Sequence, residues 1–213
     1  PLSVCCSFAG SGTPPPTPPV PTDMPLKQLL TEIASSAEKA VVVFDVDDTI
    51  LLTAYRQLRI LREFADTIAH SHPDAAHKLR GIERKGLRYA VADTATDHGI
   101  EPEMAAQIRD FWFDRFFSNP YLSEDPVVPG APEFAQAVAK AGGLPVYLTG
   151  RDENMREGTE ASLRRFGFPD PDGTQAQLIL KPKFETPDFE FKNQAAASLK
   201  NYGRVVATFE NEP

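Results

Sequence analysis

The fold is decided by one stretch of the sequence, VVVFDVDDT at residues 41–49. Its first four residues form a continuous apolar run, which is typical of a strand that is buried on both faces of a parallel sheet. Three aspartates follow at once: Asp45, Asp47 and Asp48. Because ligands of open α/β sheets bind at the carboxyl ends of strands, the stretch predicts a polar site directly after a central strand.

Three more apolar runs follow this strand along the chain, at residues 146–148, 178–180 and 205–209. Segments with the apolar spacing of helices lie between them. They cover residues 25–39, 132–141, 153–166 and 188–200. Strands that alternate with helices predict an α/β fold, a Rossmann-like parallel sheet with helices on both faces.

Residues 55–117 interrupt this alternation with three stretches of helical spacing, of which the second includes Leu79, Ile82 and Leu87, and prolines break the pattern after them. We therefore expect a helical cap inserted after the first strand, at residues 55–125. The α/β core is then made of residues 23–54 and 126–213. Residues 1–22 include the run PPPTPP at positions 14–19, which is typical of a disordered, extended tail.

The composition limits the classes of partner. The chain has 213 residues and a formal net charge of −8, so generic binding of nucleic acid is disfavoured. A small phosphorylated substrate stays compatible with this charge, because a bound cation can reverse the local field. Both cysteines, Cys5 and Cys6, lie at the start of the chain, which excludes a disulfide framework for the fold. The oligomeric state is left open.

The N-terminal residues bear on localisation. Residues 2–5, with the sequence LSVC, are loosely similar to a bacterial lipoprotein cleavage box, although Val4 stands where a small residue is expected. Together with the proline-rich tether, they favour export to the periplasm or a lipid anchor, which would be the chain's one tether to a membrane. The alternative is a cytoplasmic protein whose tail has no targeting role.

Clustered carboxylates indicate a metal site. Like charges a few ångströms apart raise each other's pKa unless a cation lies between them. Magnesium, a hard cation that prefers oxygen ligands, would relieve this cost for Asp45 and Asp47. Glu210 and Glu212, at the end of the last strand, are both candidates to complete the oxygen cage. A helix cap or an acidic loop is the alternative interpretation.

The second strand ends in Thr149, Gly150 and Arg151. A hydroxyl and backbone N–H groups at a strand-to-helix turn can hold a phosphate, and a glycine lets the backbone approach it closely. Taken alone, Thr149 would be interpreted as a helix cap.

A lysine is expected to neutralise both the attacking carboxylate and the phosphate. Lys192, early in the helix at residues 188–200, is the preferred candidate. Lys181 and Lys183 are rivals, since Lys181 directly follows a strand. A solvated helix lysine is the alternative for Lys192.

The order of these motifs resembles the haloacid dehalogenase superfamily, over about residues 41–212. The phrases PGAPEF at 129–134 and LTGRD at 148–152 are similar to its acid-phosphatase-like branch. The resemblance implies a sheet in which the first and fourth strands are neighbours and the second flanks the first. One departure is that Glu210 and Glu212 stand where the superfamily usually has aspartates.

The resemblance also implies roles for the motif residues. Asp45 would be the nucleophile that forms an aspartyl phosphate, and Asp47 the general acid and then the general base. Magnesium would be held by Asp45, by the backbone carbonyl of Asp47 and by Glu210. The residues implied to bind the substrate's phosphate are Thr149, Gly150, Arg151 and Lys192.

The expected function is therefore a magnesium-dependent phosphatase that hydrolyses a small phosphate monoester. Dehalogenases of the superfamily lack the second aspartate, because halide leaves without a proton, so Asp47 favours a phosphatase. A phosphotransferase would use the same groups and remains an alternative. A non-catalytic, surface-anchored binding protein and a receiver-type signalling domain are further alternatives, disfavoured by the intact motifs and by the long insertion respectively.

Overall fold

The computed structural model describes residues 3–5 and 26–211 of the chain. The chain divides into two compact units. Unit 1 comprises Pro1–Leu51, Val127–Arg156 and Leu163–Pro213, and unit 2 comprises Leu52–Pro126 and Glu157–Ser162. The insertion expected at residues 55–125 falls within the main part of unit 2, which also takes a short piece of a later helix.

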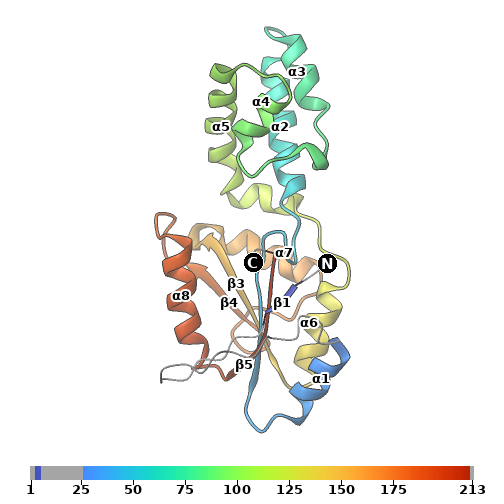
Figure 1. Cartoon of the computed structure of the whole chain (residues 1–213), viewed down its shortest axis with the longest axis vertical. Coiled ribbons are helices and arrows are strands. Elements are labelled where there is room, and N and C mark those ends of the chain that lie inside the picture. The colour runs from blue at the N-terminus through green and yellow to red at the C-terminus, as the bar shows by residue number, and fades with distance from the viewer. Residues whose placement is uncertain (1–2, 6–25, 212–213) are drawn as a thin grey trace, which may run out of the picture. The chain divides into compact units, whose positions relative to one another are not determined.

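Unit 1 is built on a parallel sheet, which confirms the predicted fold class. Its parallel strands follow the order β5-β2-β3-β4, so the first parallel strand along the chain lies between the last and the second, as expected (Figure 1). The strands are β2 (Ala40–Phe44), β3 (Leu144–Asp152), β4 (Gln177–Lys181) and β5 (Arg204–Glu210).

Helices cover both faces of this sheet, because both alternating sets of side chains on β2 are apolar. Val42 and Phe44 pack with residues of α1, α6 and α7. Val41 and Val43 pack on the opposite face with residues of α8, and Figure 1 shows α8 on one side of the sheet and α1 and α6 on the other. The helices of unit 1 are α1 (Leu26–Ser35), α6 (Ala131–Lys140), η3 (Glu153–Met155) and α8 (Asp188–Leu199), and α7 (Arg156–Arg165) is divided, because its residues Glu157–Ser162 belong to unit 2.

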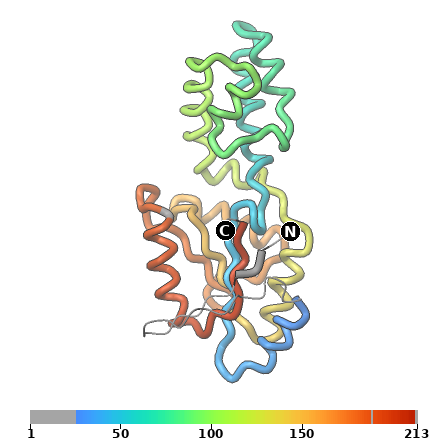
Figure 2. The backbone as a smooth tube through the Cα atoms, in the orientation of Figure 1, coloured from blue at the N-terminus to red at the C-terminus, as the bar shows by residue number. Residues whose placement is uncertain are grey.

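A short strand in the N-terminal tail differs from the expectation of a disordered segment. Strand β1 (Ser3–Cys5) pairs antiparallel with β5, with Ser3 opposite Glu210. Without it, β5 would be an edge strand with unpaired backbone groups, which are a template for any extended segment. In Figure 2, β5 runs next to β2. The other residues of the expected tail lie outside the described ranges.

Unit 2 is helical and has an apolar core of its own. The expected single helix through Leu79, Ile82 and Leu87 is wrong: α3 ends at Arg80, and Gly81 caps it. Ile82 and Leu87 instead reach the core from the connecting segment, so their spacing imitated a helix. The elements are α2 (Ala54–Ile68), α3 (Pro73–Arg80), η1 (Arg84–Gly86), α4 (Val91–Asp97), α5 (Pro102–Phe116) and η2 (Asn119–Glu124).

The two ends of the insertion lie side by side. Leu51 and Val127 form an antiparallel bridge, and the Leu52 N–H donates to the Pro126 carbonyl at 2.9 Å. One residue before this proline, the buried carboxylate of Asp125 forms an ion pair with Arg56 of α2 at 3.1 Å. The chain therefore enters and leaves the insertion at one point.

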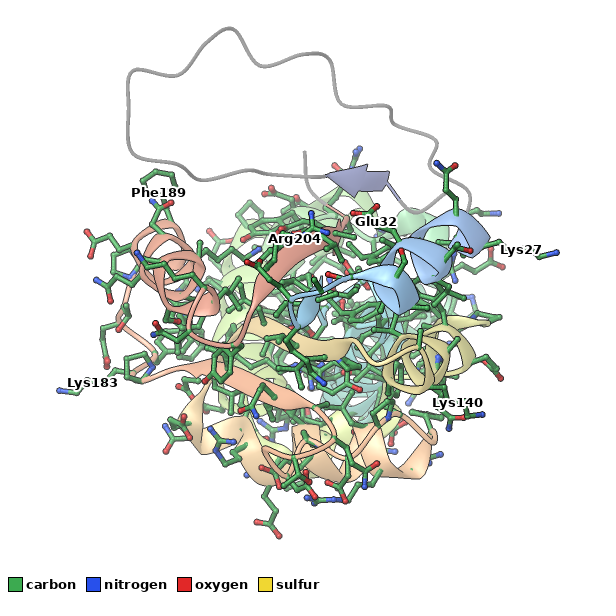
Figure 3. All side chains as sticks on the ribbon, turned by 90° about the horizontal axis from the view of Figure 1, so that it is seen from below. Lys27, Glu32, Lys140, Lys183, Phe189 and Arg204 are labelled. Carbon is green, nitrogen blue, oxygen red and sulfur yellow. The ribbon has the colours of Figure 1, made fainter. Side chains whose placement is uncertain are left out.

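At the amino end of β5, an ion pair joins the sheet to α1. In Figure 3, Arg204 of β5 lies beside Glu32 of α1, and their ion pair measures 3.1 Å. Phe189 at the start of α8 points outward. None of the helices in the described ranges is both long and apolar enough to cross a membrane.

Candidate active site at the carboxyl ends of the strands

The carboxyl ends of two neighbouring strands bring two carboxylates together. Asp45 directly follows β2, and Glu210 is the last residue of β5. The Asp45 N–H donates to the Phe209 carbonyl at 2.9 Å, which joins the two strand ends. Lys192 of α8 contacts the Glu210 carboxylate, and its Nζ lies 3.7 Å from Oδ1 of Asp45. The structure thus gathers the expected nucleophile, metal ligand and lysine.

The carboxyl group of Asp45 is strongly perturbed. The pKa of Asp45 is raised from 3.8 to about 7, with burial as the largest cause; the charge of Lys192 opposes this rise, and the charges of Asp47 and Glu210 add to it. Thr49 opposes the rise by a hydrogen bond. A cation favours the charged form of a carboxyl group. A cation bound here would therefore lower the pKa of Asp45 and favour its carboxylate form at neutral pH.

Thr49 contacts the nucleophile candidate, although it is not among the expected site residues. Its side chain is fully buried, and Oγ1 lies 3.1 Å from Oδ2 of Asp45 and 3.3 Å from Oδ1 of Asn211. The turn between Asp45 and Thr49 requires Asp48 to adopt a φ of 56°, a left-handed conformation in which aspartate is enriched. The signal was present, as the last letter of the 45–49 motif, whereas no pattern marked Asn211.

Asp47 has different partners, among them two side chains from the end of β3. Oγ1 of Thr149 donates to Oδ2 of Asp47 at 3.3 Å. The guanidinium of Arg151 donates to the same carboxylate, with Nη2 at 2.7 Å from Oδ1 and Nε at 3.1 Å from Oδ2. Thr149 and Arg151, both expected to bind phosphate, are thus in direct contact with the expected acid–base residue.

The local backbone at Thr149 differs from the expected strand-to-helix turn. Strand β3 continues through Thr149, Gly150 and Arg151 to Asp152. A shift of register follows Leu148, after which Asp152 pairs with Lys181 of β4. An irregularity of this kind adds residues to one strand and redirects its side chains, so the strand carries the motif past the point where its apolar run ends.

The three candidate lysines separate clearly. Lys192 lies beside Asp45, whereas Nζ of Lys181 donates to the Phe184 carbonyl at 3.2 Å and lies over the ring of that residue. Lys183 is exposed and points outward in Figure 3. Of the three, Lys192 is the one in position to act on Asp45.

The oxygen atoms at this edge suit a hard divalent cation. Within the described ranges no three His, Cys, Asp or Glu side chains gather closely enough to hold a metal. Asp45 and Glu210 nevertheless share one cation already, the ammonium of Lys192, and the third implied ligand is a backbone carbonyl, that of Asp47. Oxygen donors of these kinds fit magnesium. Glu212, the other candidate ligand, lies outside the described residues.

Comparisons with known proteins bear on the fold. No family model matches the chain, and no curated protein matches it. A solved structure from Clostridium difficile, assigned as a phosphatase, is 15% identical over 78% of this chain and 72% of that chain, with a TM-score of 0.51. A haloacid dehalogenase superfamily hydrolase of subfamily IA from Geobacter sulfurreducens PCA is 11% identical over 78% and 75%, with a TM-score of 0.50.

The class C acid phosphatase of Bacillus anthracis, solved with tungstate bound, is also similar. It is 16% identical over 86% of this chain, with a TM-score of 0.48. The chain spans 57% of the length of that acid phosphatase. At these identities the likeness to the Clostridium difficile and Geobacter sulfurreducens structures shows the fold alone, an α/β fold that the chain shares with both.

Proposed function

We propose that this protein is a magnesium-dependent phosphatase that hydrolyses a small phosphate monoester through an aspartyl phosphate on Asp45. The observation that carries the proposal is the convergence of Asp45, Glu210 and Lys192 at the ends of adjacent strands. Asp47, two residues further along, supplies a second carboxylate with separate partners. Two carboxylates in different environments are the requirement for separate nucleophilic and acid–base roles.

In the first chemical step, an oxygen of Asp45 attacks phosphorus, and the bond to the substrate's alcohol oxygen breaks. Asp47 gives its proton to that oxygen, so that the product leaves as a neutral alcohol. Lys192, at 3.7 Å from Asp45, supplies positive charge where the phosphoryl group is transferred.

In the second step, water attacks the phosphorus of the aspartyl phosphate. Asp47, now ionised, takes a proton from that water, and the carboxylate of Asp45 leaves. The products are inorganic phosphate and the regenerated protein, with Asp47 protonated again. The side chain of Asp47 is 34% exposed whereas that of Asp45 is 11% exposed, which suits the residue that must exchange protons.

The metal would be held by the carboxylates of Asp45 and Glu210 and by the backbone carbonyl of Asp47. When bound, magnesium supplies charge that neutralises the phosphate oxygens. Replacing Glu210 would remove one proposed ligand and leave the nucleophile in place. A Glu210 variant therefore tests metal binding without changing the residue that attacks phosphorus.

The test is an assay with p-nitrophenyl phosphate, first in chelator and then with magnesium restored. We expect no turnover in chelator and full recovery with magnesium. Glu210→Gln should raise the magnesium concentration needed for half-maximal rate, and Glu185→Gln, which changes an exposed carboxylate, is the matched control. Full activity in chelator would show that the reaction does not need the metal. A second assay with added glycerol distinguishes hydrolysis from phosphotransfer, because a phosphotransferase would form glycerol phosphate.

A further inference from the structure

The guanidinium of Arg151 is buried against the carboxylate of Asp47. The side chain is 2% exposed, and its ion pair with Asp47 measures 2.7 Å. Nε and Nη2 both donate to the carboxylate of Asp47, so the ion pair is bidentate. Such a fork fixes the plane of a carboxylate as well as its position.

A second contact from the same strand completes the arrangement. Thr149 Oγ1 donates to Asp47 at 3.3 Å and accepts the Arg151 N–H at 3.2 Å. Both side chains come from the end of β3, two residues apart, and both contact the carboxylate of Asp47. One strand end therefore holds Asp47 from two directions.

The fork that Arg151 could offer to a phosphate is engaged by Asp47. The planar fork of a guanidinium matches the geometry of a carboxylate or of a phosphate with two donors. In Arg151 the edge formed by Nε and Nη2 is directed at Asp47. An acid–base residue works only within hydrogen-bond reach of its proton, and a misplacement of about 1 Å can cost roughly 100-fold in rate.

We propose that Arg151 is a positioning residue that fixes the orientation of Asp47, and that it is not a ligand of the substrate's phosphate. The inference rests on the proposed function, in which Asp47 moves the protons. It replaces the role in phosphate binding that the sequence suggested for this arginine.

The experiment is a double-mutant cycle read out by two quantities. The variants are Arg151→Met, Asp47→Asn and the two combined. We expect Arg151→Met to lower kcat for p-nitrophenyl phosphate by about 100-fold. The double variant should be no slower than Asp47→Asn alone, because residues that act as a unit are not additive.

The second quantity is the inhibition constant of inorganic phosphate. It should change by less than about 3-fold in Arg151→Met, whereas Lys192→Met should raise it by roughly 10-fold or more because that charge faces the phosphate. Two results together would overturn the inference. The first is a double variant whose loss in kcat is the product of the two single losses, and the second is an inhibition constant of phosphate that rises about 10-fold in Arg151→Met.

A conservative variant guards against a general loss of structure. Arg151→Lys keeps the charge but not the planar fork, so kcat should stay low while the phosphate constant and the melting temperature stay near the parent values. Recovery of kcat to the parent rate would show that charge alone is enough, and would overturn the inference. Failure of the proposed function is a separate result: the parent protein then has no phosphatase activity at all. That result would also overturn the inference.

Discussion

Asp45 and Asp47 are two residues apart, but they lie in different surroundings. Asp45 is buried, and its cationic neighbour, Lys192, is shared with Glu210. Asp47 is more exposed, and it receives two donors from one arginine and another from Thr149. An ammonium is a compact charge on a flexible stem, whereas a guanidinium is a rigid planar fork.

The difference indicates a division of labour. At Asp45 the positive charge can be exchanged or supplemented, since two carboxylates compete for one ammonium. At Asp47 the carboxylate is fixed in orientation. A nucleophile needs charge compensation that changes during the reaction, and a proton-transfer group needs a constant position, so each aspartate has the kind of partner that its proposed role requires.

The largest expected effect is that of Asp45→Asn. It removes the attacking oxygen, and turnover of p-nitrophenyl phosphate should fall by roughly 10⁴-fold or more. Rapid-quench kinetics with a labelled phosphoryl group should detect no label on the peptide of residues 41–50. Turnover near the parent rate would eliminate Asp45 as the nucleophile and end the comparison with Asp47.

Asp47→Asn should behave differently from Asp45→Asn. An aryl leaving group departs without a proton, so the first step should proceed, but the second step loses its base, which is worth about 100- to 10,000-fold. We expect a burst of one product equivalent followed by a stall, with the phosphoryl group on Asp45. Slow turnover with neither a burst nor a labelled peptide would contradict the two-step role of Asp47.

Lys192→Ala should cost roughly 100- to 1,000-fold in kcat, as other single electrostatic donors in active sites do. Lys181→Ala is the matched control, because this lysine contacts Phe184. It should retain most of the activity. Steady-state assays of both variants at saturating magnesium decide the point, and a larger loss at Lys181 would reverse the assignment.

A further expected effect is on stability. Because burial raises the pKa of Asp45 to about 7 from 3.8, the folded protein keeps a proton in this interval that the unfolded chain has lost. The free energy of unfolding of the metal-free protein should therefore fall as pH rises from about 4 to about 7, by at most about 1.4 kcal/mol per pH unit from this group.

Asp45→Asn should remove that part of the pH dependence and make the metal-free protein more stable than the parent near pH 7. Urea unfolding in chelator at about pH 4.5 and about pH 7.5 measures both effects, with Glu185→Gln as the control. Identical pH profiles for the parent and Asp45→Asn would mean that this carboxyl group titrates normally in the folded protein.

Much of the sheet could be predicted from the sequence, because the apolar run at residues 41–44 and the later runs each filled one buried strand. The order of strands came from the resemblance rather than from the runs. The convergence of Asp45 and Glu210 followed from that order, since carboxyl ends of parallel strands meet at one edge.

The partners of individual side chains could not be predicted in the same way. Arg151, which contacts Asp47, lies where the register of β3 shifts after Leu148, and no residue pattern marks that shift. Strand β1 was missed because its pairing depends on an edge that only the folded sheet presents. In unit 2, Ile82 and Leu87 were assigned to a helix because their burial from a connecting segment gives the same spacing.

The adjacent ends of the insertion have a consequence for how such a chain can change over generations. Leu51 and Val127 already form a bridge, and the inserted helices bury their own apolar core. A gene segment that encodes this insertion can therefore be exchanged for another whose ends are equally close, with little disturbance to the sheet. Selection can thus act on the inserted module and on the aspartate pair as separate heritable parts.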